Sequence, residues 1–319
     1  MNQIIECVPN ISEGRDKEVI DAIATAISSV GNVSLLHVDT GIATNRTVYT
    51  FAGLPESVCE AAFQMTRRAC ELIDMRRHKG THPRQGVVDV LPLVPVSGIT
   101  LEECAELARQ LAQRIADELG IPSYAYEAAA FKPERRNLAV CRAGEYEALS
   151  GKLYTPELRP DFMPADFPDD GTVPETIQRS GISVIGARKY LIAVNFNLDT
   201  KDVRVAKEIA ADVRESGRGP GRPGVLKSAK AIGWYIEEYG IAQVSMNLTD
   251  IDITPLHRAY EEVKRSAQRH GVRVNGTEII GLIPQRVLTE AGPDMVKAMN
   301  LNDLRPFNSK EKVIEELIG

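Results

Sequence analysis

Residues 77–86, RHKGTHPRQG, hold the side chains of this sequence that are best suited to proton transfer near neutral pH. The segment contains two imidazoles, His78 and His82, and histidine is the side chain whose ordinary pKa lies in that range. Pro83 biases the backbone of His82 toward an extended conformation, which aims the imidazole before any tertiary contact forms. Glycines on either side favour bends. This loop is therefore the first candidate site, and the rest of the chain is expected to position it.

The i,i+4 spacing of His78 and His82 matches that of a helical zinc motif. Such a motif needs a continuous helix and a carboxylate beside the first histidine, whereas here the neighbour is Lys79. Gly80 and Pro83 would also interrupt a helix. The sequence therefore disfavours a metal site, and we expect no metal cofactor. A solvated basic loop without a role is the other interpretation.

Length and composition predict a soluble globular chain of two domains. With 319 residues, each half is long enough to bury its own core. The formal net charge of −6 argues against nucleic-acid binding, because affinity for phosphate comes from a surplus of Lys and Arg. The 5 cysteines are scattered, which argues against a disulfide framework. The N-terminus lacks a signal-peptide pattern and no apolar run reaches a membrane-spanning length, so we expect a cytoplasmic protein with no membrane partner.

Hydrophobic periodicity in the first half predicts the order β-α-β-β-α-β. Short apolar or alternating runs predict strands, and apolar residues three and four apart predict helices. The expected elements are a strand at 3–8, a helix between Ser12 and Gly31, strands at 35–39 and 47–53, a helix from Pro55 to Ile73, and a strand at 87–94. The last strand is mostly apolar and is expected at the centre of its sheet. Thr100 and Glu103 predict a capping box for a further helix that ends at Gly120, followed by a strand at 123–127.

The second half predicts the same order again. A proline-rich stretch at 154–183 is typical of a linker or a lid. The elements expected after it are a strand at 191–198, a helix near 203–213, a hairpin of strands at 227–236 and 242–248, a helix near 256–267 and a strand within 272–283. The repeated order predicts an α/β (α+β) fold of two subdomains, residues 1–180 with the linker and residues 181–319. Their sheets are expected to pack face to face with helices outside.

Polar side chains at strand ends are the second candidate set. Amides buried in strands need partners, so they either bond backbone groups or together bind a polar ligand. These residues are Asn10, Asn195, Asn197, Asn247 and Thr249. The connection between the strands at 35–39 and 47–53 holds further polar candidates, which are Asp39, Asn45 and Arg46.

Several long motifs resemble the formiminotransferase domain family. They are ECVPNISEGRD, TNRTVYTFAG, LIDMRRHKGTHPRQGVVDV, RAGEYEAL, GARKYLIAVNFNL, AIGWYIEEYGIAQVSMNLTD and DLRPFNSKEKVIEELI. The resemblance covers nearly the whole chain in order. It implies two α/β subdomains with facing sheets, and an enzyme that moves the formimino group of N-formimino-L-glutamate to N5 of tetrahydrofolate in histidine degradation and one-carbon metabolism.

The resemblance also implies partners. Tetrahydrofolate, with one or more glutamates in its tail, would be a co-substrate. Because no cyclodeaminase module follows Gly319, a separate cyclodeaminase is expected in the pathway. A homodimer is expected as well. Two alternatives stay open: transfer of a formyl group between glutamate and tetrahydrofolate, in 5-formyltetrahydrofolate metabolism, and a folate-binding protein without catalysis.

Particular residues take roles from the resemblance. His82, in the HPR motif, corresponds to the catalytic histidine and is expected to act as general acid and base. The folate-binding segment follows a PDFGP motif, which is PDFMP here, with Met163 in place of glycine. The candidate folate-binding residues are Phe162, Met163, Pro164, Ala165, Asp166, Phe167 and, beyond extra residues, Gly186. The stretch at 160–183 is expected to order over a bound pterin.

The chemistry of these substrates suggests further residues. Asp39 would orient His82 or bind the cationic formimino group, unless it is a solvated loop acid. Arg46 or Arg84 would clamp the glutamate carboxylates. A local basic track for the folate tail would comprise Arg188, Lys189, Arg218, Arg222, Lys227 and Lys230. Asn10, Asn45, Asn195, Asn247 and Thr249 complete the predicted binding set.

Overall fold

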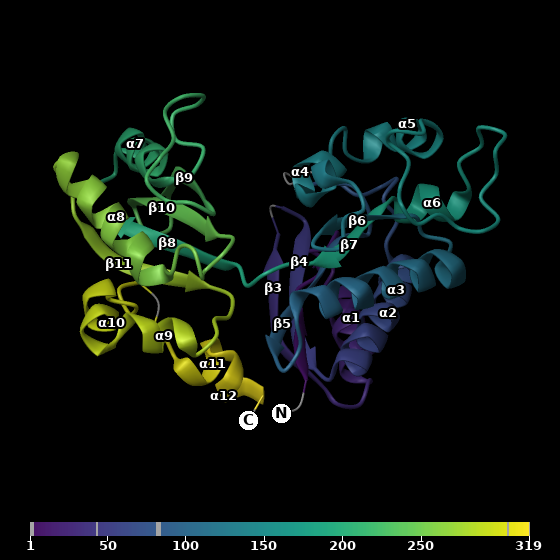
Figure 1. The fold of residues 1–319 in the computed structure, drawn as a ribbon, viewed down its shortest axis with the longest axis horizontal. Helices are drawn as coiled ribbons and strands as arrows, with labels where there is room; N and C mark the ends of the chain where they lie inside the picture. The colour runs from purple at the N-terminus through teal and green to yellow at the C-terminus, as the bar shows by residue number, and fades with distance from the viewer. Residues whose placement is uncertain (1–2, 43, 81–83, 305, 319) are drawn as a thin grey trace. The chain divides into compact units, whose positions relative to one another are not determined.

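The computed structural model describes residues 3–42, 44–80, 84–304 and 306–318 and contains two compact units, Met1–Arg188 and Lys189–Gly319 (Figure 1). Both units are mixed α/β, as predicted, with one sheet each. In the part of the chain that is described, no helix is long and apolar enough to span a bilayer. Residues 181–188, which the sequence placed in the second subdomain, belong to the first unit, because β7 (Ser183–Ala187) pairs in parallel with strands of its sheet.

The first unit is built on a seven-stranded sheet. Its strands besides β7 are β1 (Ile4–Cys7), β2 (Asn10–Ile11), β3 (Val33–Gly41), β4 (Arg46–Gly53), β5 (Val88–Ser97) and β6 (Ser123–Glu127). β3 pairs with β4, and both β1 and β2 lie between β4 and β5 in antiparallel pairing. β5 then pairs with β7, and β7 with β6, in parallel. The prediction that β5 is central is confirmed.

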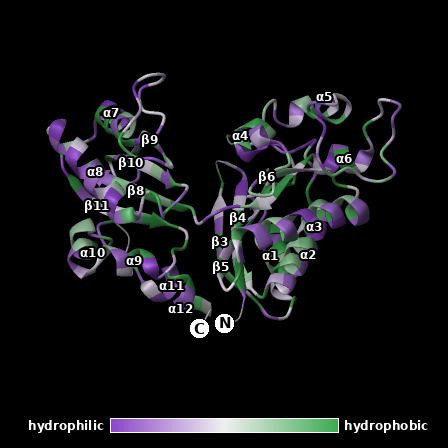
Figure 2. Cartoon of the chain, viewed as in Figure 1, coloured by the Kyte–Doolittle hydropathy of each residue, from purple (hydrophilic) through white to green (hydrophobic). Residues whose placement is uncertain are grey.

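Three long helices cover one face of this sheet, as Figure 1 shows. They are α1 (Lys17–Ser28), α2 (Pro55–Leu72) and α3 (Leu101–Leu119). The predicted capping box of Thr100 and Glu103 is present at the start of α3, and Gly120 ends the helix in the left-handed conformation at φ 68°. Hydrophilic and hydrophobic residues alternate around α3 (Figure 2). The apolar sides of the helices bury Tyr49 and Phe51 of β4 in the main core.

The segment 128–180 covers part of the opposite face. Its short helices are η1 (Pro133–Arg136), α4 (Leu138–Cys141), η2 (Tyr146–Ala148), α5 (Leu149–Tyr154) and α6 (Glu175–Ser180). They form a second core in which Leu153 and Ile177 pack with Val90 of β5 and Val184 of β7. The interpretation of 154–183 as a linker is therefore wrong, because this stretch packs onto the sheet of the first unit.

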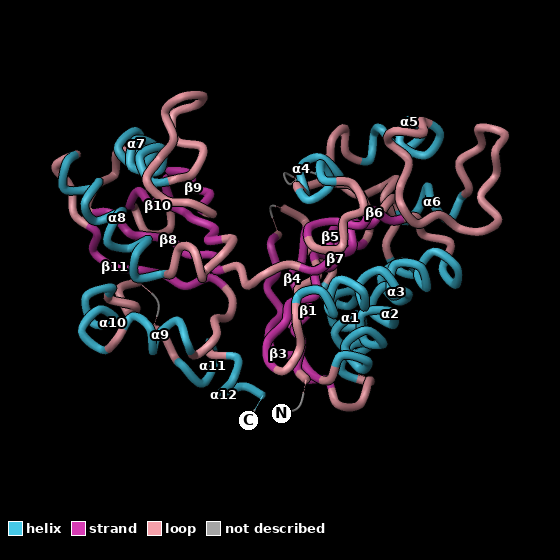
Figure 3. The backbone as a smooth tube through the Cα atoms, viewed as in Figure 1, coloured by secondary structure: helices cyan, strands magenta, loops and turns pink. Residues whose placement is uncertain are grey.

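The second unit has a four-stranded antiparallel sheet in the order β11-β8-β10-β9. Its elements are β8 (Ile192–Leu198), α7 (Val203–Val213), β9 (Ala229–Ile236), β10 (Ile241–Leu248), α8 (Leu256–Arg269) and β11 (Val274–Ile280). Shorter helices follow: α9 (Arg286–Ala291), α10 (Pro293–Met299), α11 (Ser309–Lys312) and α12 (Ile314–Ile318). Figure 3 shows the strands and the helices of this unit as separate layers.

The predicted repeat is present. The order β8-α7-β9-β10-α8-β11 of the second unit matches β1-α1-β3-β4-α2-β5 of the first. The pairing matches as well, since β8 lies between β10 and β11 as β1 lies between β4 and β5. Each sheet carries its long helices on one face, so the part of the other face that segment 128–180 leaves uncovered in the first unit, and the other face in the second, are available for side chains of a site. The packing of the two sheets against each other stays a prediction.

Candidate functional site

The loop of the candidate histidine is held at both of its described ends. His82 itself, with Thr81 and Pro83, lies outside the described residues. On the upstream side, Asn45 Nδ2 donates to Lys79 O at 3.1 Å and His78 Nε2 donates to Asn45 O at 2.9 Å. Asn45 also accepts from the Gly14 amide at 3.0 Å. Asn45 therefore ties the loop to the turn before β4.

Gly80 is fixed by steric fit. A Cβ on this residue would lie 2.1 Å from the carbonyl oxygen of Thr44, so no larger residue fits without a shift of the backbone.

Burial lowers the pKa of His78, which favours the neutral ring. Its Nε2 is committed to Asn45, so this nitrogen helps to hold the loop.

Arg84 forms the downstream anchor. Its Nη1 donates to Met75 O and to His78 O, each at 2.7 Å. Its Nε donates to Glu147 Oε1 at 3.2 Å, and its guanidinium lies 4.8 Å from the centre of the Tyr146 ring. The contacts of Arg84 favour a role in shaping the loop over the predicted role as a carboxylate clamp.

A buried lysine supports the residue after Arg84. Lys152 Nζ donates to Gln85 Oε1 at 2.7 Å and to Cys141 O at 3.3 Å. Burial lowers the pKa of Lys152 to about 8. Next along the chain, Ser12 Oγ donates to Gly86 O at 2.8 Å. No feature of the sequence singled out Lys152, because its partners are distant along the chain.

Arg46 lies in a charged cluster with two residues from other segments. Its guanidinium and that of Arg142 both bond to Oδ2 of Asp89, whose carboxylate is fully buried. Burial, with a smaller contribution from Arg142, lowers the pKa of Arg46 to about 9. Sequence reasoning chose Arg46 but missed Arg142. The signal for Asp89 was present, as a single acid within an apolar strand.

Asp39 and Asn10 lie in one row across the first sheet. Both pair with Val48 of β4, Asp39 from β3 and Asn10 from β2. Paired residues of antiparallel strands point to the same face, and here it is the face opposite Tyr49 and the long helices. Alternation along β4 puts Arg46 on this face too. The structure therefore brings three predicted residues to one face, and Asp39 is exposed there.

The predicted folate segment is packed into the first unit. Phe162 is buried in the main core, and its backbone exchanges two hydrogen bonds of 3.0 Å with Ser123. Met163 and Phe167 pack against the second core, Pro164 is buried, and Ala165 and Asp166 are exposed.

Gly186 and Arg188 lie at the end of the first unit. Gly186 is buried in β7, where a Cβ would lie 2.2 Å from Tyr126 O, so close strand packing explains this glycine. The Arg188 amide donates to Leu93 O at 3.0 Å, which continues the pairing of β7 with β5.

In the second unit, the predicted amides belong to polar networks on the helix-free face of the sheet. Asn197 Nδ2 donates to Asp303 Oδ2 at 2.9 Å and accepts from Gln243 Nε2 at 2.7 Å. Gln243 accepts in turn from Trp234 Nε1 at 3.1 Å. Asn195 Nδ2 donates to Glu278 Oε2 at 3.1 Å. Most of these amide groups therefore have protein partners.

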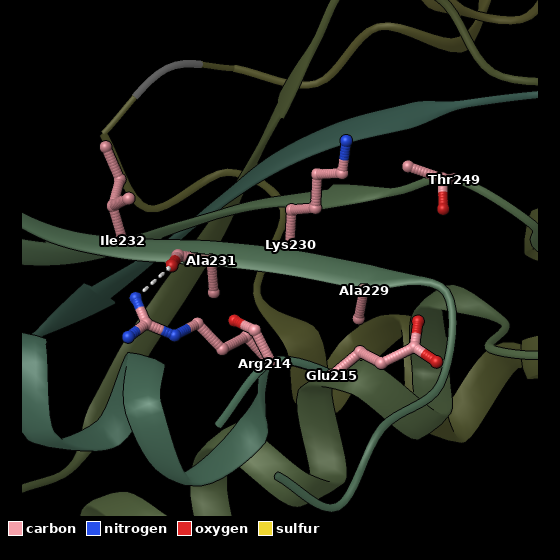
Figure 4. Close-up of a pocket in the computed structure, with 8 residues that line it drawn as sticks. Arg214, Glu215, Ala229, Lys230, Ala231, Ile232 and Thr249 are labelled. Atoms are coloured by element: carbon pink, nitrogen blue, oxygen red, sulfur yellow. Dashed lines mark hydrogen bonds between the residues drawn. The ribbon is translucent and has the colours of Figure 1, made fainter. Parts of the chain in front are cut away.

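A shallow hollow of about 430 Å³ lies beside β9 (Figure 4). Lys230 and Thr249 line it from one side, with Arg214 and Glu215 from the end of α7. Lys230 was one of the predicted basic residues.

The other basic candidates of the second unit are mostly paired. Lys189 Nζ lies 2.8 Å from Asp250 Oδ2, and Arg218 contacts Glu208 and Asp212. Lys227 lies 3.9 Å from Glu215, whereas Arg222 is exposed. The predicted amide Asn247 is exposed as well. The predicted basic track is therefore only partly available for a ligand.

Comparison with known families and proteins gives matches over nearly the whole chain. Residues 4–188 match the family described as formiminotransferase domain, N-terminal subdomain, and residues 193–319 match the formiminotransferase domain. The formimidoyltransferase-cyclodeaminase of Rattus norvegicus is 47% identical over 100% of this chain, which spans 60% of that protein. The glutamate formimidoyltransferase of Streptococcus pyogenes serotype M1 is 42% identical over 91% of this chain and 92% of its own length. That of Thermoplasma acidophilum is 39% identical over 98% of both chains.

Proposed function

Because the chain belongs to the formiminotransferase domain family, we propose that it transfers the formimino group of N-formimino-L-glutamate to N5 of tetrahydrofolate, releasing L-glutamate and 5-formiminotetrahydrofolate. The observation that carries this proposal is the match to glutamate formimidoyltransferases over nearly the full length of both chains. Tetrahydrofolate is a co-substrate in this reaction.

The reaction needs one group that takes a proton and returns it. N5 attacks the amidine carbon, a tetrahedral intermediate forms, and the departing glutamate nitrogen gains a proton. We propose that His82 accepts the proton from N5 and gives it to the leaving nitrogen. The anchors at Asn45 and Arg84 support this role, because they fix the chain on both sides of His82.

Asp39 is the second residue that we propose for the chemistry. Its carboxylate is exposed on the face of the first sheet opposite the long helices, in the same row as Asn10 and on the same face as Arg46. The donor amidine is cationic when protonated, and a carboxylate stabilises it by charge. Asp39 would therefore hold the formimino group or orient His82.

The folate contacts are proposed from the family resemblance and from side-chain chemistry. Met163 and Phe167 offer apolar surface for the pterin, and the exposed Asp166 offers a hydrogen-bond acceptor. In the second unit, Lys230 and Thr249 line the hollow beside β9 and would bind polar parts of the folate tail. A homodimer and a cytoplasmic location stay predictions.

The proposal is tested by supplying the purified chain with tetrahydrofolate and either N-formimino-L-glutamate or N-formyl-L-glutamate. We expect release of L-glutamate from the formimino donor at a rate proportional to enzyme. Release only from the formyl donor would replace the reaction with formyl transfer. Folate binding without release of glutamate from either donor would reduce the protein to a folate-binding role.

A further inference from the structure

Asp89 holds two guanidinium groups at once. Its carboxylate is fully buried in β5, and its Oδ2 accepts from Arg46 at the start of β4 and from Arg142 just after α4. Three separate segments of the first unit therefore converge on one oxygen.

Arg142 shares its carboxylate partner with a second cation. Among the described residues, Asp89 is the only acid that Arg142 contacts, and Asp89 also bonds to Arg46. The neighbouring Tyr126 does not supply a charge, because burial raises the pKa of its phenol. A largely buried cation is costly unless an anion completes its environment.

Two polar atoms of the cluster lack a partner within the described part of the chain. They are Arg142 Nε, which is a donor, and Asp89 Oδ1, which is an acceptor, and both are buried. Buried polar atoms in native proteins nearly always have partners. A ligand that offers an anionic oxygen and an N–H group would satisfy both, whereas a purely anionic ligand would satisfy only the arginine.

The cluster lies beside the anchored loop along two chain segments. Arg46 directly follows Asn45, whose side chain holds Lys79. Asp89 follows soon after Gly86, which Ser12 holds. A ligand at the cluster would therefore be near the loop that carries the proposed catalytic residue.

We propose that the guanidinium pair bridged by Asp89 is the subsite for the α-carboxylate of the glutamyl donor, and that Arg142 is its specificity-determining residue. This rests on the proposed function, because the donor carries a carboxylate next to a substituted nitrogen. Arg142 Nε would donate to the carboxylate, and Asp89 Oδ1 would accept the N–H of that nitrogen. The side chain of Arg142 is 20% exposed, although its Nε is buried.

The test compares Arg142→Met and Arg142→Lys with Arg136→Met, a matched change of an exposed arginine in η1. Arg142→Met should raise KM for N-formimino-L-glutamate by about tenfold or more, with KM for tetrahydrofolate unchanged. Arg142→Lys should give an intermediate value, because it keeps the charge but loses the Nε–H. Removal of Arg142 leaves Asp89 paired with Arg46, so the variant should fold.

Ligand binding gives a second readout that does not depend on turnover. N-acetyl-L-glutamate and inorganic phosphate serve as probes, measured by calorimetry on the wild-type protein and on Arg142→Met. Binding of N-acetyl-L-glutamate that the variant loses supports the subsite even if the wild type releases no glutamate, an outcome in which only the proposed function fails. Phosphate that binds as tightly as N-acetyl-L-glutamate, or an unchanged donor KM in Arg142→Met beside an active wild type, would overturn the inference.

Discussion

Asn45 Nδ2 donates to the carbonyl oxygen of Lys79 at 3.1 Å, which ties the turn before β4 to the segment that leads to His82. Asn45 has a φ of 50°, in the left-handed region that asparagine tolerates better than most residues. It is also buried, and its Oδ1 accepts from the Gly14 amide. One side chain therefore sets both the local backbone and the position of the loop.

Asn45→Ala should lower the free energy of unfolding by about 1–3 kcal/mol, because it leaves buried groups without partners and strains the left-handed backbone. It should also lower kcat, since the loop loses its upstream anchor. Urea denaturation and steady-state kinetics measure the two effects. Asn45→Gly is the control for backbone strain, and a kcat for this glycine variant equal to that of wild type would show that the side-chain bonds do not position the loop.

His82→Ala should lower kcat by about 10²–10⁴, the range typical of general acid–base catalysis. The free energy of unfolding and the affinity for tetrahydrofolate should persist, because the anchors at Asn45 and Arg84 do not involve the imidazole of His82. His257→Ala in α8 is the matched control and should retain activity. A His82→Ala enzyme with turnover near that of wild type would remove this residue from the mechanism.

The regular elements could be predicted because their signals are local. The capping box of α3 needs only Thr100 and Glu103, and the central position of β5 follows from its apolar run. The stretch at 154–183 could not be predicted in the same way. Its place in the fold depends on a core in which Ile177 and Val90 are buried together, although they are far apart in sequence and leave no periodic pattern.

The candidate site shows the same difference between local signals and contacts made by distant segments. The pattern around His82 and the chemistry of Asp39 and Arg46 could be recognised from residue types and motifs. The contact of Arg142 with Asp89 could not, because it joins segments that only the folded sheet brings together. Sequence reasoning also gave Arg84 a ligand role, whereas its donors are used by backbone carbonyls and Glu147.

Phe162→Ala should lower the free energy of unfolding by about 3–5 kcal/mol, as expected for removal of a core phenylalanine. Phe162 is 8% exposed, packs in the main core and lies 5.8 Å from the ring centre of Phe131. Urea denaturation measures the loss. Met163→Gly is the comparison, because Met163 is only half-buried. Stability like that of wild type together with weaker folate binding in Phe162→Ala would favour the lid that the sequence predicted.

The buried ammonium of Lys152 should make stability depend on pH. Burial lowers the pKa of Lys152 from 10.5 to about 8 in the folded protein. Between these two values the unfolded chain binds more protons at this site than the folded chain, so the free energy of unfolding rises with pH. Below about 8 the residue is protonated in both states, and its contribution is constant there.

Urea denaturation of the wild type and of Lys152→Met, from about pH 7 to about pH 10, measures this effect. The difference in free energy of unfolding, wild type minus variant, should be flat up to about pH 8 and then increase. Subtraction of the variant removes the titration of other groups, including Arg46. Lys17→Met, a change of an exposed lysine in α1, should give no comparable rise. A difference that stays flat above pH 8 would show that Lys152 keeps an ordinary pKa, in which case its bond to Gln85 supports the loop without a pH-dependent cost.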